Sequence, residues 1–195
     1  MKASLRRLFI PFAVVGFGIV LIAAYFALVE TGPSATSPSA IGGPFSLVAQ
    51  DGRTVTDADF KGEPRLVFFG YTHCPDICPT TLFDMTQVFQ KLGSNKKVVG
   101  LFITVDPERD TPAVMKDYMS SFDPRIIGLS GTREAIDPVL KEYRVYSRKV
   151  PTDGADYSMD HSAIVYLMDK QGRFVNAFNL EQPPDAAAQQ LQAYL

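Results

Sequence analysis

Two cysteines, Cys74 and Cys78, are the residues of this chain best suited to chemistry. They are the only cysteines among 195 residues, and three residues separate them in the segment THCPDICP. An apolar run at residues 65–71 ends directly in this segment. Pro79 fits the first turn of a helix, where its missing N–H is not needed. We therefore expect the cysteines at the junction of a buried strand and a helix, where the helix N-terminus favours a thiolate.

Three kinds of chemistry fit this pair. A structural disulfide suits an oxidising compartment, but closing so short a loop stabilises a fold by only about 2 kcal/mol. A redox dithiol would use a thiolate exposed in the loop, although thioredoxin-type motifs have two residues between their cysteines. A metal site would use both thiolates, which are soft ligands that select Cu(I) or zinc, and a histidine ligand would also tolerate Cu(II).

The chain has two histidines that could join the cysteines. His73 adjoins Cys74, but neighbouring residues of an extended segment point their side chains apart. His161 lies 83 residues after Cys78, at the start of an apolar strand predicted at residues 162–168, where an ordinary hydrogen-bonded histidine is the plain interpretation. In doubly wound sheets, however, ligands gather where loops cluster near a helix N-terminus. His161 could therefore close a three-ligand site, and its open position would suit copper that must be handed on.

Three further features have plainer interpretations. Asp76, between the cysteines, could orient a ligand or solvate the loop, or it could be a helix N-cap. Met159 offers a soft sulfur, but methionine at a strand end more often packs. The segment DPERDTP, residues 106–112, is rich in carboxylates but has no histidine or serine motif near it. We expect a loop, a helix start and a docking surface there rather than acid–base catalysis.

Alternating strands and helices predict one α/β domain. Strands are predicted at residues 45–50 and 54–56, which form a hairpin, and at 65–71, 98–105, 126–129, 162–168 and 173–178. Helices are predicted at residues 82–92, 111–122, 132–144 and 185–195. This order favours parallel strands with helical crossovers, helices on both faces of the sheet and one antiparallel edge. Pro138 should kink its helix or start a second helix after Asp137.

The first 44 residues predict a membrane anchor and a tether. Residues 8–29 carry no charge, and 19 of these 22 residues are aliphatic or aromatic, enough for a spanning helix. The basic stub at residues 1–7 predicts a cytoplasmic N-terminus, with the rest of the chain outside the cytoplasm. A cleaved signal peptide is the alternative, but its apolar region is usually shorter. Residues 30–44 have the composition of a flexible linker, which leaves the folded domain at residues 45–195.

Composition and charge narrow the class of protein. With 46% hydrophobic and 21% charged residues, the chain suits one folded domain rather than two. Residues 31–195 carry 16 Lys and Arg against 20 Asp and Glu, so nucleic acid is not an expected partner. A short, arginine-flanked anchor without a transit peptide favours a bacterial inner membrane, with the folded domain in the periplasm.

Three segments, FGYTHCPDICPTTL, TVDPERDTP and DHSAIVYLMDKQGRF, resemble in order and spacing the Sco/SenC copper chaperones of cytochrome c oxidase assembly. The resemblance runs from about residue 45 to the C-terminus. It implies a thioredoxin-like fold with an added N-terminal β-hairpin, preceded by a single transmembrane helix. It also implies that Cys74, Cys78 and His161 bind copper, as Cu(I) and Cu(II). The implied partner is the oxidase subunit that carries the binuclear copper centre.

The function expected from these features is a membrane-anchored copper chaperone that delivers copper to cytochrome c oxidase, with other copper carriers as further partners. Because thiol ligands must be deprotonated, Cys74 and Cys78 would bind copper only when reduced. A disulfide between them would switch loading off. The alternative is a thiol:disulfide oxidoreductase that reduces the copper-ligand cysteines of the oxidase, so enzymatic activity stays open. A peroxidase and a redox or copper sensor are weaker alternatives.

Overall fold

The structure is a computed structural model that describes Ile22, Tyr25 and residues 41–152 and 156–195. The expected stub, anchor and linker fall almost wholly outside these described residues. Within the described part of the chain, no helix has the length and apolar character needed to cross a membrane. Chain contacts divide the protein into the units Met1–Ser39 and Ala40–Leu195, and the second unit carries the fold.

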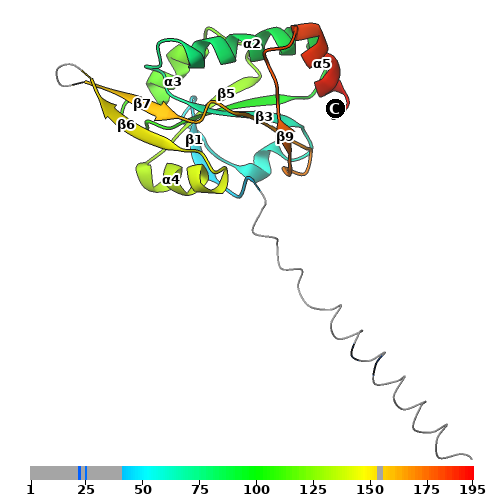
Figure 1. Ribbon diagram of the computed structural model, residues 1–195, viewed down its shortest axis with the longest axis horizontal. Coiled ribbons are helices and arrows are strands. Elements are labelled where there is room, and N and C mark those ends of the chain that lie inside the picture. The colour runs from blue at the N-terminus through cyan, green and yellow to red at the C-terminus, as the bar shows by residue number, and fades with distance from the viewer. Residues whose placement is uncertain (1–21, 23–24, 26–40, 153–155) are drawn as a thin grey trace, which may run out of the picture. The chain divides into compact units, whose positions relative to one another are not determined.

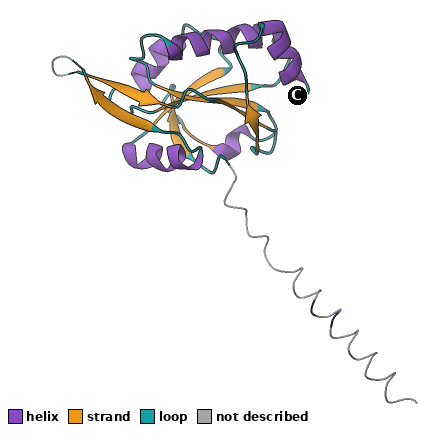
Figure 2. Cartoon of the chain, viewed as in Figure 1, coloured by secondary structure: helices purple, strands orange, loops and turns teal. Residues whose placement is uncertain are grey.

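A seven-stranded sheet with the order β2-β1-β5-β4-β3-β8-β9 forms the centre of this unit (Figure 2). Its strands are β1 (Ser46–Ala49), β2 (Thr54–Thr56), β3 (Arg65–Gly70), β4 (Val99–Thr104), β5 (Ile126–Ser130), β8 (Val165–Met168) and β9 (Phe174–Ala177). The predicted parallel core of β3, β4 and β5 is confirmed, as are both hairpins. The sheet has two antiparallel edges instead of one, because β1 pairs with β5 in a contact between segments distant in the chain.

Helices cover both faces of the sheet, as the alternating pattern predicted. They are η1 (Asp57–Phe60), α2 (Ile77–Leu92), α3 (Pro112–Met119), α4 (Arg133–Glu142) and α5 (Pro184–Gln192). Figure 1 shows α2 and α5 on one side of the sheet and α4 on the other. Every residue of β3 is buried, which explains its continuous apolar run. The loop that carries Cys74 therefore begins at the end of a fully buried strand.

Two helices differ from the bounds that the sequence predicted. Helix α2 begins at Ile77, before the periodic segment at residues 82–92, so Pro79 lies in its first turn, as predicted, and so does Cys78. Helix α4 continues through Pro138 as one helix, so of the two predicted alternatives, a kink or a second helix after Asp137, the second helix is absent from the described residues. Its three buried side chains, of Ile136, Val139 and Leu140, contribute about 1.5–3 kcal/mol each. Their burial outweighs the cost of about 3 kcal/mol for an internal proline.

A two-stranded hairpin, β6 (Ser147–Pro151) and β7 (Tyr157–His161), forms a separate small sheet that the sequence analysis missed (Figure 1). Its register pairs Ser147 with His161 and Pro151 with Tyr157. His161 therefore ends β7 and does not start the strand predicted at residues 162–168, since β8 begins only at Val165. This hairpin is the element that carries the histidine.

Candidate metal centre

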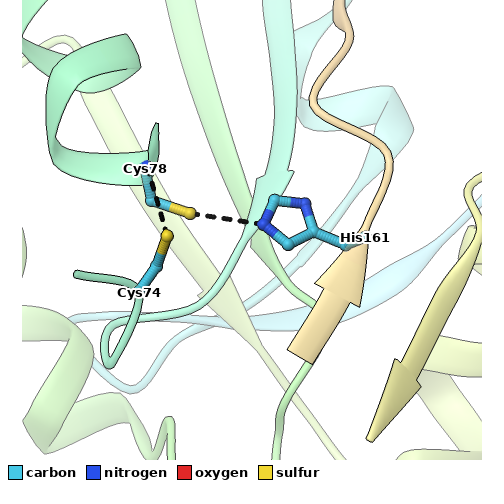
Figure 3. A group of neighbouring side chains, drawn as sticks. All are labelled: Cys74, Cys78 and His161. Atoms are coloured by element: carbon cyan, nitrogen blue, oxygen red, sulfur yellow. Dashed lines mark hydrogen bonds between the residues drawn. The ribbon is translucent and has the colours of Figure 1, made fainter. Parts of the chain in front are cut away.

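Cys74, Cys78 and His161 lie side by side, although they come from three different segments (Figure 3). Cys74 stands in the loop after β3, Cys78 in the first turn of α2, and His161 at the end of β7. Their sulfur and nitrogen ligand atoms all lie within 4.8 Å of one another. The Cys78 sulfur is 3.6 Å from Nε2 of His161. Both cysteines are free and buried, so the three residues singled out from the sequence do converge.

Gly70, the last residue of β3, leaves the space in which the Cys78 sulfur lies. A Cβ atom at this position would stand 2.6 Å from Sγ of Cys78 and 2.7 Å from Cε2 of Phe102. Real Cβ atoms do not approach other heavy atoms so closely, since protein interiors are close-packed. A side chain at residue 70 would therefore displace the sulfur.

The loop that carries Cys74 is tied to the end of β4. The backbone N–H of Thr72 donates to the Asp110 carboxylate at 3.1 Å, and the Thr72 hydroxyl donates to it at 2.6 Å. The hydroxyl of Thr104 donates to the same carboxylate at 2.6 Å. Asp110 is fully buried, and this burial raises the pKa of its carboxyl group. The three hydrogen bonds compensate the burial of this polar side chain.

Aromatic rings and one backbone carbonyl orient the His161 ring. The rings of Tyr71 and Phe68 meet it edge-on, with centroids at 5.8 and 6.3 Å. Nδ1 of His161 lies 3.1 Å from the Ser162 carbonyl, so Nδ1–H donates there and leaves the Nε2 lone pair facing Cys78. Such a second hydrogen bond is typical of histidines that bind metals. Burial lowers the pKa of His161 and so favours the neutral, ligating imidazole.

The two cysteines differ in their surroundings. Burial raises the pKa of the Cys78 thiol, so a metal must displace its proton. The N–H of Cys78 donates a hydrogen bond to the Cys74 sulfur at 3.4 Å, at the N-terminal end of α2. Two soft sulfurs and one imidazole nitrogen within reach of a single ion are a donor set that fits Cu(I). Three ligands also leave room for an entering ligand.

The other residues considered from the sequence lie outside this cluster or have plain roles. His73 is exposed, and its Nδ1 lies 3.1 Å from the Thr72 hydroxyl. Asp76 stands at the N-cap of α2, yet its side chain makes no capping hydrogen bond. Met159 is buried against the core, which agrees with packing. These observations leave the ligand set at three residues among those described.

The carboxylate-rich loop at residues 106–110 differs from the expectation. Asp106 and Asp110 are both fully buried, so their carboxylates do not form the predicted docking surface. Asp110 accepts a hydrogen bond from Thr72, and Asp106 accepts one from Tyr157. These partners lie 38 and 51 positions away in the chain, so the sequence shows no local sign of the contacts. The predicted helix start is confirmed, because the Thr111 side chain accepts a hydrogen bond from the N–H of Val114 at 3.3 Å.

Comparison with known proteins places this arrangement in a family. The family described as SCO1/SenC matches residues 33–195. This chain belongs to the SCO1/SenC family. The mitochondrial SCO1 homolog 1 of Arabidopsis thaliana is 42% identical over 160 residues, 81% of this chain and 48% of that protein. An SCO2-like protein of Rickettsia prowazekii is 42% identical over 144 residues, 72% of this chain and 70% of that protein. The chain spans about half the length of its Arabidopsis relatives.

Solved SCO1/SenC structures share the fold. ScoI of Bradyrhizobium japonicum, solved with copper bound, is 57% identical with a TM-score of 0.78, covering 80% of this chain and 99% of that one. Yeast Sco1 with copper bound is 38% identical with a TM-score of 0.72, covering 79% and 87%. BsSco, a member of the Sco family of cytochrome c oxidase assembly proteins with a disulfide switch, is 27% identical with a TM-score of 0.63, covering 82% and 96%. The predicted α/β thioredoxin-like fold is confirmed.

Proposed function

We propose that this protein is a copper chaperone that binds one copper ion through Cys74, Cys78 and His161. It would deliver that ion to the binuclear copper centre in the copper-bearing subunit of cytochrome c oxidase. One observation carries the proposal: two free thiols and an imidazole converge within 4.8 Å in a chain of the SCO1/SenC family. Solved relatives from Bradyrhizobium japonicum and yeast have copper bound, which supports copper as the cargo.

The arrangement suits transfer better than permanent storage. Structural zinc sites are closed by four ligands, whereas this group offers three. A thiolate of the oxidase subunit, or of another copper carrier that loads the protein, could enter the open position before a ligand of this chain leaves. The ligands also come from three separate elements, a loop, a helix and a hairpin. Each ligand could therefore release the copper ion without unfolding the elements that carry the other two. Copper would thus pass by stepwise ligand exchange.

The proposed location is the bacterial inner membrane, with the folded domain in the periplasm. Its support is the charge-free run at residues 8–29 behind the basic residues Lys2, Arg6 and Arg7. A protease added to intact spheroplasts should cleave the folded domain, and the protein should remain with the membrane after a salt wash. Recovery in the soluble cytoplasmic fraction would contradict this location.

A second candidate function is a thiol:disulfide oxidoreductase that reduces the copper-ligand cysteines of the oxidase. The free, adjacent Cys74 and Cys78 favour it, as does the disulfide switch of the relative BsSco. In that function the two thiols lose two protons and two electrons to a disulfide of the oxidase subunit and become a disulfide themselves. His161 takes no part in this step. Dependence on His161 therefore separates the two functions.

The test is an anaerobic Cu(I) titration of the reduced protein against a competing chelator. We expect the unmodified protein to bind one copper ion. Its affinity should fall at least about tenfold in both Cys78→Ser and His161→Ala, because replacing even a residue that only orients a metal ligand lowers metal affinity that much. The matched control is His73→Ala, which removes the other histidine from a position beside Cys74. Its affinity should equal that of the unmodified protein.

Delivery is tested by mixing the copper-loaded protein with the copper-free soluble domain of the oxidase subunit and separating the two. We expect copper to move to the oxidase domain. If His161→Ala binds copper normally but the protein still reduces a disulfide in the oxidase domain, the oxidoreductase function replaces the chaperone.

A further inference from the structure

The hairpin that carries His161 is not part of the main sheet. Strands β6 and β7 pair only with each other in the described residues. Backbone pairing with β4 and β8 holds β3, the strand that leads into the Cys74 loop, within the sheet, but no such pairing holds β7 there. The position of the imidazole must depend on side-chain contacts between the hairpin and the rest of the domain.

Arg109, in the loop between β4 and α3, makes the densest of these contacts. Its Nη1 donates to the Tyr157 carbonyl at 2.9 Å and to the Asp156 carboxylate at 3.0 Å. Its Nε donates to the Asp106 carboxylate at 2.5 Å. The guanidinium also lies over the Tyr157 ring, 3.7 Å from its centroid, a favourable cation–π geometry. The Arg109 side chain thus contacts both the backbone carbonyl and the ring of Tyr157, the first residue of β7.

Asp106 closes this contact into a ring of three side chains. Its second carboxylate oxygen accepts a hydrogen bond from the Tyr157 hydroxyl at 2.9 Å. Asp106 is fully buried, and its own backbone N–H donates to the Thr104 hydroxyl at 2.8 Å. Lys149 of β6 pairs in addition with Glu108 of the same loop. The loop at residues 106–110 therefore holds both strands of the hairpin.

Tyr157, which Arg109 contacts, and His161 lie on the same face of β7. Side chains alternate along a strand, so Tyr157, Met159 and His161 point the same way. Tyr157 and His161 stand four residues apart, about 13 Å at the usual strand rise. The guanidinium of Arg109 also lies 5.8 Å from the Tyr71 ring, which meets the imidazole edge-on at 5.8 Å. Holding Tyr157 therefore sets how β7 is rotated and where His161 points.

We propose that Arg109 is a positioning residue, which holds β7 so that Nε2 of His161 faces the two cysteine sulfurs. This inference rests on the proposed copper site. The same loop holds the other side of that site, since Asp110 binds Thr72, two residues before Cys74. Residues 106–110 thus fix the distance between the cysteine loop and the histidine hairpin.

The test replaces Arg109 by glutamine and by lysine in the full chain. Lysine keeps the charge but lacks the planar fork that donates to three acceptors while stacking on a ring. We expect both variants to bind Cu(I) about tenfold more weakly, because removing a residue that orients a metal ligand typically lowers metal affinity by at least that factor. In the Cu(II) form, the nitrogen hyperfine splitting from the imidazole should weaken in the electron paramagnetic resonance spectrum, while the thiolate charge-transfer absorption should remain.

The matched control is Arg125→Gln. Arg125 also forms a two-point pair with an aspartate, Asp123, and lies over an aromatic ring, that of Phe89 at 5.1 Å. Its side chain is 21% exposed, against 17% for Arg109. This variant should lose comparable stability but keep the copper affinity and the nitrogen signal. If it weakens copper binding as much as Arg109→Gln does, the role of Arg109 is merely structural.

A double-mutant cycle with His161→Ala decides whether Arg109 acts through the histidine. The tenfold loss expected for Arg109→Gln should shrink to less than about twofold when His161 is already absent. Equal losses in both backgrounds would overturn the positioning role while leaving the copper site intact. An unchanged affinity in His161→Ala alone would overturn both the ligand set and this inference.

A milder variant covers the case in which Arg109→Gln fails to fold. Tyr157→Phe removes only the hydroxyl that donates to Asp106 and keeps the ring under the guanidinium. We expect a loss of Cu(I) affinity of about threefold, the effect of one hydrogen bond, again absent in the His161→Ala background. A loss that persists without His161 would count against the inference.

Discussion

At the scale of single residues, the close approach of Gly70 to the Cys78 sulfur links the sheet to the site. The sulfur occupies the volume that a side chain at residue 70 would need. Interiors packed this densely respond to one added methyl group, and overpacking costs about 1–3 kcal/mol. The strain can be relieved either by moving the sulfur or by loosening the strand.

Gly70→Ala should weaken Cu(I) binding by about tenfold, because moving the sulfur away from His161 costs affinity and about 1.4 kcal/mol corresponds to a factor of ten. The measurement is the chelator competition, with thermal unfolding of the metal-free protein alongside. The matched control is Gly131→Ala, whose added carbon would make only ordinary contacts, the nearest at 3.5 Å. Normal affinity and normal stability in Gly70→Ala would show that the space is not needed.

The pH dependence of copper binding follows from the Cys78 thiol. Burial raises the pKa of this thiol, so near neutral pH it is protonated in the metal-free protein. Copper must displace that proton, and the apparent affinity should therefore rise about tenfold per pH unit from this group alone. The neutral His161, whose pKa burial lowers, releases no proton near neutral pH. Calorimetric titrations in buffers of different ionisation enthalpy count the protons, and a pH-independent affinity would refute this account.

Residue types and spacing indicated the cysteine pair, and the family resemblance selected His161 as the third candidate ligand, but neither indicated the residues that hold them. The cysteine pair is conspicuous because it is the only one in the chain, and His161 is one of only two histidines. The role of Arg109 depends on its contacts with Asp156 and Tyr157, which lie 47 and 48 positions after it in the chain. No local pattern encodes such contacts, and the charged loop around Arg109 resembled an exposed surface.

At the scale of elements, the junction between β3 and α2 determines what the cysteines can do. The first turn of α2 places the N–H of Cys78 3.4 Å from the Cys74 sulfur, and the loop between β3 and α2 is held by Asp110 through Thr72. A disulfide would close a loop of five residues, Cys74 to Cys78. The reduced and oxidised forms should therefore differ little in overall structure.

Oxidation should stabilise the metal-free protein by at most about 2 kcal/mol, the chain-entropy value for so short a loop. For a domain of this size that corresponds to a rise in melting temperature of about 4–8 °C. Scanning calorimetry of the oxidised and reduced forms measures the difference, and the oxidised form should bind no copper. A much larger stabilisation would favour the structural disulfide over a reversible switch.

The elements that the sequence predicted well are those with unbroken apolar runs. Strands β3 and β4 are almost wholly buried, so their composition alone indicates strands. The β6–β7 hairpin was missed because β6 is mostly exposed and polar. A signal was present in β7, where Tyr157, Met159 and His161 alternate with Ser158 and Asp160. Reading this period of two would have placed His161 at the end of a strand of its own.

At the scale of the whole molecule, copper would join parts of the chain that lie far apart in sequence. Cys78 and His161 are 83 residues apart, and one belongs to the helical layer while the other belongs to the separate hairpin. An ion that binds only the folded protein stabilises it by mass action. Copper binding at the proposed site would therefore be coupled to the folding of this domain.

Loading with Cu(I) should raise the free energy of unfolding by about 4 kcal/mol when free copper exceeds the dissociation constant about a thousandfold. Anaerobic denaturant titrations with and without buffered Cu(I) measure this increase. Cys78→Ser should show an increase smaller by at least about 1.4 kcal/mol at the same free copper, since its affinity is expected to be at least about tenfold lower. Equal stabilisation of both proteins would indicate that copper binds elsewhere.

The overall topology was predictable only in part. The order of strands and helices in the chain indicated parallel β3, β4 and β5, since short helical connections join them. The antiparallel pairing of β1 with β5, Val48 with Ser130, depends on a contact across the chain. This pairing completes the sheet, and the cysteine loop and the Asp110 loop leave the ends of its adjacent central strands β3 and β4.

The central claim is that two sulfurs and one nitrogen of this chain hold one copper ion. X-ray absorption at the copper edge of the Cu(I)-loaded protein, compared with His161→Ala, tests it most directly. We predict two sulfur scatterers and one imidazole nitrogen per copper, with the imidazole scattering lost in the variant. A spectrum with sulfur ligands alone in the unmodified protein, identical to that of His161→Ala, would contradict the account.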